Sequence, residues 1–311
     1  MAEHATVALD DRRLVVELQS LGVRVEDESG GGVQGRRGGA GPSDAGFIWV
    51  RGLPLTVPMH AEYAQRSPYT LRIGDRGARL ELAGQYVAPV VVPPRPKIYD
   101  MHTADGVPYW KIALLHLDSI ASTVVQKCIY WDTPEQCAFC GIELTRDGQT
   151  VPVKTPAMLA EVCTAARDHD GAVDVTLTTG SLNRRDRGAL YISKCATAIK
   201  EACGLPVQVQ FEPPDDLSVL DEVHAAGVDA VGMHLETFDP EVLERRYPVR
   251  VRRFSLPGRR IGIEDGNRLD EDGLWREEEE GSFERWLAAG QFVFWWSREL
   301  WVGGEGNVFA T

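Results

Sequence analysis

Strict alternation of short apolar runs with amphipathic helical segments is the sequence feature that most limits what this chain can fold into. Strands that alternate with helices over short links pair in parallel, and parallel strands buried on both faces are near-continuous apolar runs. The pattern predicts an α/β fold, a partial (β/α) barrel over residues 98–250, with functional groups at the carboxyl ends of its strands. The strand candidates are 119–128, 172–179, 206–213 and 228–236, and the helix candidates are 155–170, 187–203, 215–227 and 239–247.

The chain before the barrel divides into two parts. Residues 1–45 hold one candidate short element, Arg13–Glu17, and a glycine-rich run at 30–41 that cannot bury enough apolar surface to order itself. We therefore expect a flexible N-terminal segment. Residues 46–97 predict a small β-rich accessory region, because short β-type runs alternate there with Gly, Pro and Asp. These runs are Phe47–Val50, Thr70–Ile73 and Ala78–Leu82.

Residues 251–311 differ in composition from the rest of the chain. They hold five of the eight tryptophans and four consecutive glutamates at 277–280, and their one comparable apolar run is 291–296. No further β/α alternation is visible. We therefore interpret the chain as truncated, or as having a C-terminal tail that comes from a shifted reading frame or replaces the original sequence; a divergent C-terminal domain is the alternative. We expect an irregular tail and a sheet that stops at the fourth strand with an exposed edge.

Acidic side chains outnumber basic ones, with 46 Asp and Glu against 33 Lys and Arg and a formal net charge of −13 at pH 7. This surplus repels phosphate backbones and no basic run forms a patch, so we expect no nucleic-acid partner. The N-terminus lacks a signal sequence, and no run of about 18 apolar residues is present to span a bilayer. The interpretation is a cytoplasmic protein with no membrane partner that acts on a small molecule.

Three of the six cysteines crowd into one loop after the first strand candidate. Cys128, Cys137 and Cys140 have the spacing C-x8-C-x2-C. Three thiolates from one loop can hold three irons of a 4Fe-4S cluster and leave the fourth iron open, whereas a structural site is closed by a fourth protein ligand. The alternatives are a zinc site completed by His116 or Cys163, and a Cys-x2-Cys redox pair.

Polar residues also mark the ends of the second and third strand candidates. Thr178–Ser181 closes the second, where glycine permits close approach to the main chain; an ordinary turn of small residues is the alternative. Gln208, Gln210 and Glu212 alternate along the third and share one face, which in a parallel barrel is the interior. Polar groups that face inward need partners or a polar ligand, so Gln210 and Glu212 are candidate cofactor contacts.

The cysteine loop resembles that of the radical SAM superfamily. The usual triad there is C-x3-C-x2-C with an aromatic residue before the last cysteine, and the CAFC segment has Phe139 at that position. The resemblance implies that Cys128, Cys137 and Cys140 ligate a 4Fe-4S cluster and that Phe139 flanks the adenine of S-adenosylmethionine. The first gap of eight residues departs from the usual spacing and leaves the shape of the loop open.

Two further segments add to this resemblance. Thr179, Gly180 and Ser181 lie where the family has a turn that receives the amino group of the methionyl moiety. The HLET segment is similar to a motif of lipoyl synthases and biotin-synthase-like members, which implies that Glu236, with His234 beside it, contacts cofactor or substrate. The alternative is that His234 and Glu236 satisfy one another inside the barrel.

The order of motifs over residues 98–248 is similar to that of uncharacterised radical SAM proteins encoded beside nitrilase-like hydrolases. The resemblance implies reductive cleavage of S-adenosylmethionine to a 5′-deoxyadenosyl radical that acts on a small organic substrate, in nitrile- or cyanide-linked metabolism. It also implies an electron donor such as a flavodoxin or ferredoxin. The alternatives are a zinc-binding structural module and an inactive remnant of a radical SAM enzyme. No catalytic side chain is identified beyond the cofactor contacts.

Overall fold

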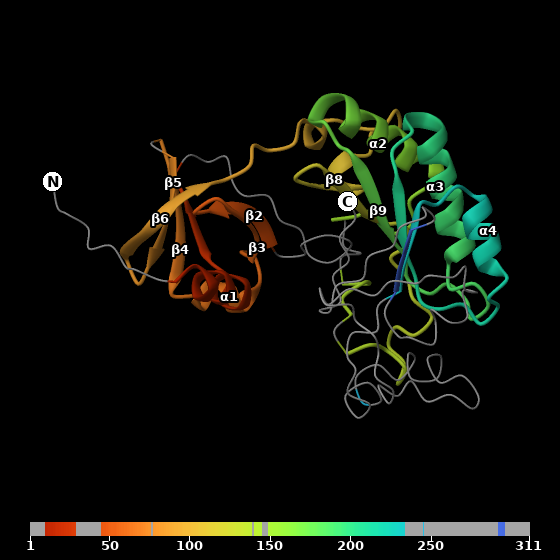
Figure 1. Cartoon of the computed structure of the whole chain (residues 1–311), viewed down its shortest axis with the longest axis horizontal. Helices are drawn as coiled ribbons and strands as arrows, with labels where there is room; N and C mark the ends of the chain where they lie inside the picture. Colours follow the sequence, from red (N-terminus) through yellow and green to blue (C-terminus); the bar gives the residue numbers. More distant parts are fainter. Residues whose placement is uncertain are drawn as a thin grey trace, which may run out of the picture.

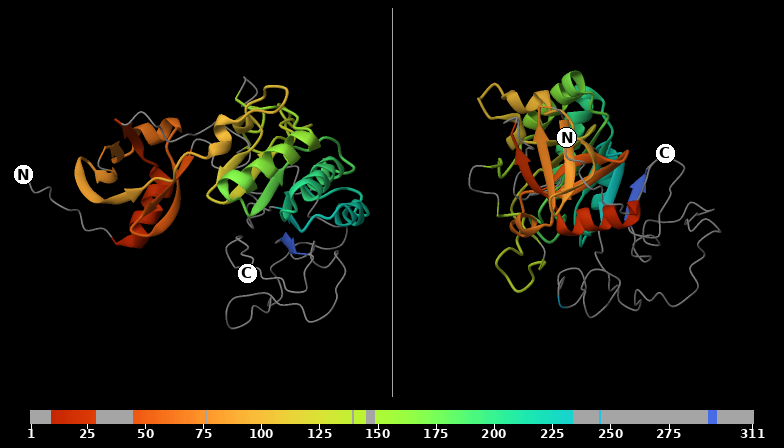
Figure 2. Two further views of the ribbon diagram at one scale, coloured as in Figure 1. Left: turned by 90° about the horizontal axis from the view of Figure 1, so that it is seen from above. Right: turned by 90° about the vertical axis from the view of Figure 1, so that its left-hand side faces the viewer.

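The computed structural model shows two six-stranded sheets in separate bodies, joined by the extended segment 92–96 (Figure 1). It describes residues 10–28, 45–75, 77–138, 140–144, 149–233 and 245, and the backbone of 292–295. The view from above in Figure 2 shows the same separation. None of the described helices combines the length and the hydrophobicity that a membrane span requires.

The N-terminal body is a mostly antiparallel sheet with strand order β1-β4-β5-β6-β2-β3. Among its described strands, only β1 and β4 pair in parallel. The three short runs expected between residues 46 and 97 lie in β2, β4 and β5. The elements are α1 (Asp11–Leu21), β1 (Arg24–Asp27), β2 (Ala45–Val50), β3 (Leu53–Pro58), the 3₁₀ helix η1 (Glu62–Arg66), β4 (Tyr69–Gly74), β5 (Gly77–Leu82) and β6 (Gln85–Val91).

Residues 10–28 of the segment expected to be flexible form helix α1 and strand β1, and the short element expected at Arg13–Glu17 lies within α1. Helix α1 begins after Asp10, whose carboxylate accepts a hydrogen bond from Arg12 N at 3.3 Å, and Leu14 and Leu18 are buried against the sheet. Two leucines four residues apart share one helix face, so one amphipathic helix covers the sheet beside an otherwise polar sequence. The glycine-rich run at 30–41 lies outside the described residues.

The second body is a curled sheet, a half-barrel, with strand order β12-β11-β10-β9-β8-β7. Strands β8 to β11 pair in parallel, whereas β7 and β12 pair antiparallel at the two edges. Helices α2, α3 and α4 cover one face of it (Figures 1 and 2). The elements are η2 (Lys97–Asp100), η3 (Tyr109–Lys111), β7 (Leu114–His116), β8 (Ser119–Thr123), α2 (Pro156–Asp170), β9 (Asp174–Thr178), α3 (Ala189–Cys203), β10 (Val207–Gln210), α4 (Val219–Ala225), β11 (Ala230–Met233) and β12 (Phe292–Trp295).

The expected alternation is confirmed from the first strand to the fourth, since β8, α2, β9, α3, β10, α4 and β11 follow one another in this order. Apart from residue 245, the helix expected at 239–247 lies outside the described residues. The expectation that the sheet ends at the fourth strand is wrong, because the backbone of 292–295 pairs antiparallel with β11. The apolar run at 291–296 supplies this strand; the rest of 251–311 lies outside the described residues.

The core of the second body lies between the sheet and its helices. Val175 and Leu177 in β9 and Val207 and Val209 in β10 are at most 1 % exposed and pack with apolar residues of α2 and α3. Because side chains alternate along a strand, the residues between them belong to the other face. The inner face of the half-barrel is therefore free of helices in the described part of the chain and carries the polar residues.

Replacing Thr155 by Ala should lower the free energy of unfolding by about 1 kcal/mol. Thr155 caps α2, accepting a hydrogen bond through its hydroxyl oxygen from Met158 N at 3.2 Å, and Pro156 fits the first turn of the helix. Chemical denaturation measures the change. Thr155→Ser keeps the cap and is the control, so equal loss in both variants, or none in Thr155→Ala, would contradict the capping role.

Candidate functional site

A row of polar residues crosses the inner face of the half-barrel at the carboxyl ends of its strands. The register places Thr123 beside Thr178 and Thr178 beside Gln210, which pairs in turn with Gly232. The hydroxyl oxygens of Thr123 and Thr178 lie 2.9 Å apart and share a hydrogen bond. A Cβ at Gly232 would lie only 3.0 Å from Gln210 Cγ, so Gln210 lies over this glycine on the inner face. The alternation along the strand predicts this placement.

The segment that leads from β8 into the cysteine loop is hydrogen-bonded to the end of β9. Val124 N donates to the carbonyl of Thr178 at 2.7 Å, Gly180 N donates to that of Val125 at 3.0 Å, and Ile129 N donates to that of Ser181 at 2.9 Å. We call this pairing of residues 124–129 with 178–181 the strand-end seam. It fixes the position of Cys128 next to the turn at Thr179–Ser181.

Gly180 is the residue that lets the two sides of the seam approach. A Cβ at this position would lie 2.0 Å from the carbonyl oxygen of Lys127 and 2.8 Å from its carbon, which no side chain could tolerate without moving the backbone. The sequence predicts a close approach at this glycine, and the structure identifies one approaching group as the protein's own main chain, one residue before Cys128. The cofactor contact expected of Thr179, Gly180 and Ser181 stays a prediction.

The six cysteines fall into two groups by location and burial. Cys128, Cys137 and Cys140 are partly exposed on the loop after β8, and none of the six cysteines forms a disulfide. The other three lie buried in helices, Cys163 in α2 and Cys195 and Cys203 in α3. Burial raises the pKa of the Cys195 thiol to about 12 and raises that of Cys163 well above its ordinary value. Both thiols therefore stay protonated near neutral pH and are poor metal ligands.

Local hydrogen bonds close the cysteine loop on itself. Cys140 N donates to the carbonyl of Cys137 at 3.1 Å, which makes a tight turn between the second and third cysteines. The carboxylate of Glu143 accepts a hydrogen bond from Cys128 N at 3.0 Å, and so joins the far end of the loop to its first cysteine. Sequence reasoning missed Glu143; its only local signal is an acid three residues after the last cysteine.

Comparison with known proteins assigns this part of the chain. The family model described as the radical SAM superfamily matches residues 134–254. This stretch of the chain is therefore similar to the radical SAM superfamily. The match includes Cys137 and Cys140, the strands β9 to β11 and the helices between them. No curated protein and no solved structure matches the chain.

The donor atoms of the cysteine loop fit an iron–sulfur cluster in their chemistry. Three cysteines lie partly exposed on one loop, and the three remaining cysteines are buried in helices. Within the described residues, no three His, Cys, Asp or Glu side chains are already gathered at metal-binding spacing. Ligand loops commonly fold around their metal as it binds.

The structure does not support the alternative ligands considered for a zinc site. His116 ends β7 and pairs with Ser119 at the start of β8, whereas Cys128 follows the end of β8. The length of β8 thus separates His116 from the cysteine loop. Cys163 is fully buried in α2.

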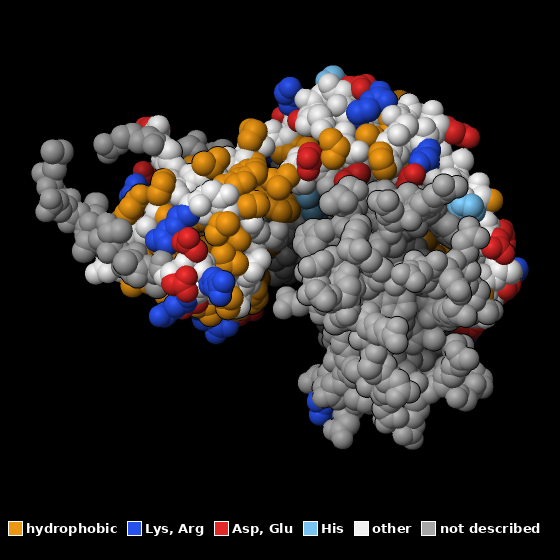
Figure 3. All heavy atoms as spheres, in the orientation of Figure 1, with side chains coloured by type: hydrophobic (Ala, Val, Ile, Leu, Met, Phe, Trp, Pro, Cys, Tyr) orange, Lys and Arg blue, Asp and Glu red, His pale blue; other side chains and the backbone are white. Residues whose placement is uncertain are grey.

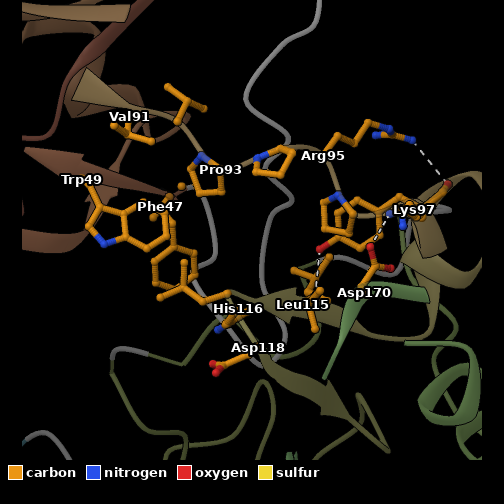
Figure 4. Close-up of a pocket in the computed structure, with 18 residues that line it drawn as sticks. Phe47, Trp49, Val91, Pro93, Arg95, Lys97, Leu115, His116, Asp118 and Asp170 are labelled. Carbon is orange, nitrogen blue, oxygen red and sulfur yellow. Dashed lines mark hydrogen bonds between the residues drawn. The ribbon is translucent and has the colours of Figure 1, made fainter. Parts of the chain in front are cut away.

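A cavity of about 570 Å³ lies at the other end of β8, between the two bodies (Figure 4). Figure 3 shows apolar side chains gathered where the N-terminal sheet faces the second body, and β2 contributes Phe47 and Trp49 to the cavity. The rings of Phe47 and His116 lie 5.3 Å apart. The carboxylate of Asp170 accepts hydrogen bonds from Lys97 N at 2.8 Å and Ile98 N at 3.0 Å. This lining contains none of the residues predicted for the radical SAM site.

The remaining predicted contacts lie at different places. Gln210 and Glu212 are half-buried at the end of β10, and Gln210 belongs to the polar row. Phe139, His234 and Glu236 lie outside the described residues. Their expected roles stay predictions, as do those of Gln210 and Glu212.

Gly180→Ala should destabilise the second body by about 2 kcal/mol, because the added methyl group has to displace the main chain at Lys127. Chemical denaturation measures the loss. Gly74→Ala in β4 is the control, since a Cβ there would meet only Glu28 Oε2, at 3.7 Å. An unfolding free energy of Gly180→Ala equal to that of the unsubstituted protein would show that the seam is not as tight as described.

Alkylation of the native apo-protein should separate the two groups of cysteines. At about pH 8 a maleimide should modify Cys128, Cys137 and Cys140 well before the three helix cysteines, whose thiols are buried. Peptide mass spectrometry after timed quenching gives the order, and protein unfolded in urea, in which all six should react, is the control. Rapid labelling of Cys163 or Cys195 in the native protein would contradict the packing of α2 and α3.

Proposed function

We propose that the chain is a radical SAM enzyme in which Cys128, Cys137 and Cys140 ligate a 4Fe-4S cluster. The observation that carries the proposal is the position of the three partly exposed cysteines. They follow a parallel strand of a curled sheet, at the edge where α/β barrels bind their ligands, and the seam holds the first of them. The radical SAM match begins within the same loop.

The three cysteines would act as thiolates, which suits three irons and leaves the fourth iron open to a small molecule. When bound, the cluster would supply the electron for reductive cleavage of S-adenosylmethionine to methionine and a 5′-deoxyadenosyl radical. Phe139 would flank the adenine, and carbonyl groups of Thr179–Ser181 would receive the methionyl amino group. The carbonyl of Ser181 already accepts from Ile129 N, and its second lone pair leaves capacity for one more donor.

The polar row on the inner face supports a polar ligand next to the loop. Gln210 offers an amide donor and an acceptor, and the hydroxyl groups of Thr123 and Thr178 hold one another in place. We propose that Gln210 and Glu212, together with His234 and Glu236, contact the cofactor or the substrate. A carboxylate at Glu236 suits the hydroxyl groups of a ribose or an ammonium group.

The substrate we propose is a small organic molecule, in nitrile- or cyanide-linked metabolism, as the likeness to proteins encoded beside nitrilase-like hydrolases implies. The net charge of −13 disfavours a nucleic-acid substrate. Reduction of the cluster needs an external one-electron donor, for which a flavodoxin or a ferredoxin is suited. The HLET segment at residues 234–237 favours the lipoyl- and biotin-synthase-like branch of the superfamily.

Anaerobic reconstitution with iron and sulfide tests the proposed function. The unsubstituted chain should take up about four irons, absorb in the visible range, and form 5′-deoxyadenosine from S-adenosylmethionine and a strong reductant. Replacing Cys128, Cys137 or Cys140 singly by Ala should abolish the absorbance, because each thiolate ligates one iron. Cys195→Ala, in the core of α3, is the matched control and should keep it.

Three results would count against the proposal in different ways. A full 4Fe-4S spectrum in Cys128→Ala would remove the first cysteine from the ligand set. Uptake of zinc in place of iron would favour a structural module. A complete cluster without 5′-deoxyadenosine would identify an inactive remnant of a radical SAM enzyme.

A further inference from the structure

Arg187 is a completely buried arginine in the loop between β9 and α3, with 0 % of its side chain exposed. Its guanidinium donates one hydrogen bond to the hydroxyl of Tyr130 and another, at 3.0 Å, to the carboxylate of Asp215. Tyr130 follows β8 and Asp215 follows β10. One side chain therefore ties together three loops that leave the carboxyl ends of three neighbouring strands, and one of these is the cysteine loop.

The backbone around Arg187 is held in a conformation that costs free energy. Arg187 has φ of 57° and Gly188 has φ of 87°, so two successive residues lie in the left-handed region, which a residue other than glycine rarely adopts. A Cβ at Gly188 would lie 3.1 Å from the carbonyl oxygen of Gly180 and from Thr179 Oγ1. The turn that presents Arg187 is thus packed directly on the strand-end seam, and tertiary contacts maintain it.

The contacts of Arg187 include a buried aromatic ring. Tyr130 is 4 % exposed, and the Arg187 guanidinium carbon lies 5.5 Å from its ring centroid. Asp215 has half of its side chain exposed and supplies the compensating charge. Burying a guanidinium costs free energy even when it is paired, so Arg187 is a costly way to stabilise a fold. A planar group with several fixed donors is well suited to bridge two partners at a set geometry.

We propose that Arg187 is a positioning residue for the cysteine loop: by holding Tyr130, two residues after Cys128, it keeps the first thiol in place for the cluster. This inference rests on the proposed function. The neighbouring Arg185 makes a different kind of contact, since its ion pair with Asp216 at 3.3 Å is solvent-exposed, with 69 % of the arginine side chain accessible. Arg185 thus serves as a matched control on the same loop.

The test compares Arg187→Lys and Tyr130→Phe with Arg185→Lys and Thr155→Ala. Lysine keeps the charge but cannot bridge two partners as a planar fork, and phenylalanine keeps the ring but loses the hydroxyl. After reconstitution, an iron chelator should remove iron about tenfold faster from the first two variants than from the unsubstituted protein. Arg185→Lys should lose iron at the unsubstituted rate. Thr155→Ala lowers stability away from the loop and shows how much of any change comes from stability alone.

Amide hydrogen exchange of the apo-proteins gives a readout that needs no cluster. Exchange in peptides covering residues 125–131 should rise in Arg187→Lys and Tyr130→Phe and stay unchanged in Arg185→Lys. Equal rates of iron loss and of amide exchange in all variants would overturn the positioning role. So would iron loss that increases only in proportion to the loss of unfolding free energy, as measured for Thr155→Ala. Either result would leave the proposed function standing. If the unsubstituted chain takes up no iron, the proposed function fails and the role of Arg187 toward a cluster fails with it. Should Arg187→Lys not fold, Tyr130→Phe alone decides.

Discussion

The strand-end seam is the interaction on which the candidate site depends. Residues 124–129 continue past the end of β8 along the end of β9, and three main-chain hydrogen bonds of 2.7–3.0 Å hold them there. Such a pairing is possible only because Gly180 has no side chain toward Lys127. The first cysteine thus leaves the sheet on a segment that is hydrogen-bonded to the end of β9. A loop that begins this way needs to order only its remaining part around a metal.

The two faces of the same strands carry different kinds of side chain. In β9 and β10 every second side chain is apolar and packs under the helices, and the residues between them are Thr and Gln on the inner face. Strands in a closed parallel barrel read as continuous apolar runs, so polar residues at every second position mark a face that is used for something other than packing. Their position at the carboxyl ends, beside the seam, gives the inner face its proposed role.

How far the sequence could predict the structure depended on whether the signal was local. Helix α2 was predicted accurately because Thr155 and Pro156 mark its start in the local sequence. Helix α1 was predicted only in part, as the short element Arg13–Glu17, because its polar surroundings hid the spacing of Leu14 and Leu18. The pairing of β12 could not be predicted, because an antiparallel edge strand needs no helix before it. Arg187 and its partners, 57 and 28 residues away, left no local pattern.

The eight residues between Cys128 and Cys137 fold into local turns. Thr133 N donates to the carbonyl of Tyr130 and Gln136 N to that of Thr133, each at 3.1 Å, so the extra residues form consecutive turns. An ion pair of 3.1 Å between Glu135 and Arg184 fastens them from outside, while Arg187 fastens Tyr130 from inside. A longer loop has more conformations to lose when it binds a metal, and contacts that order it beforehand reduce that entropic cost. In our proposal, the contacts of the β9–α3 loop with Glu135 and Tyr130 offset part of the entropic cost of the long gap, and they hold the first cysteine through residues outside the three-cysteine motif.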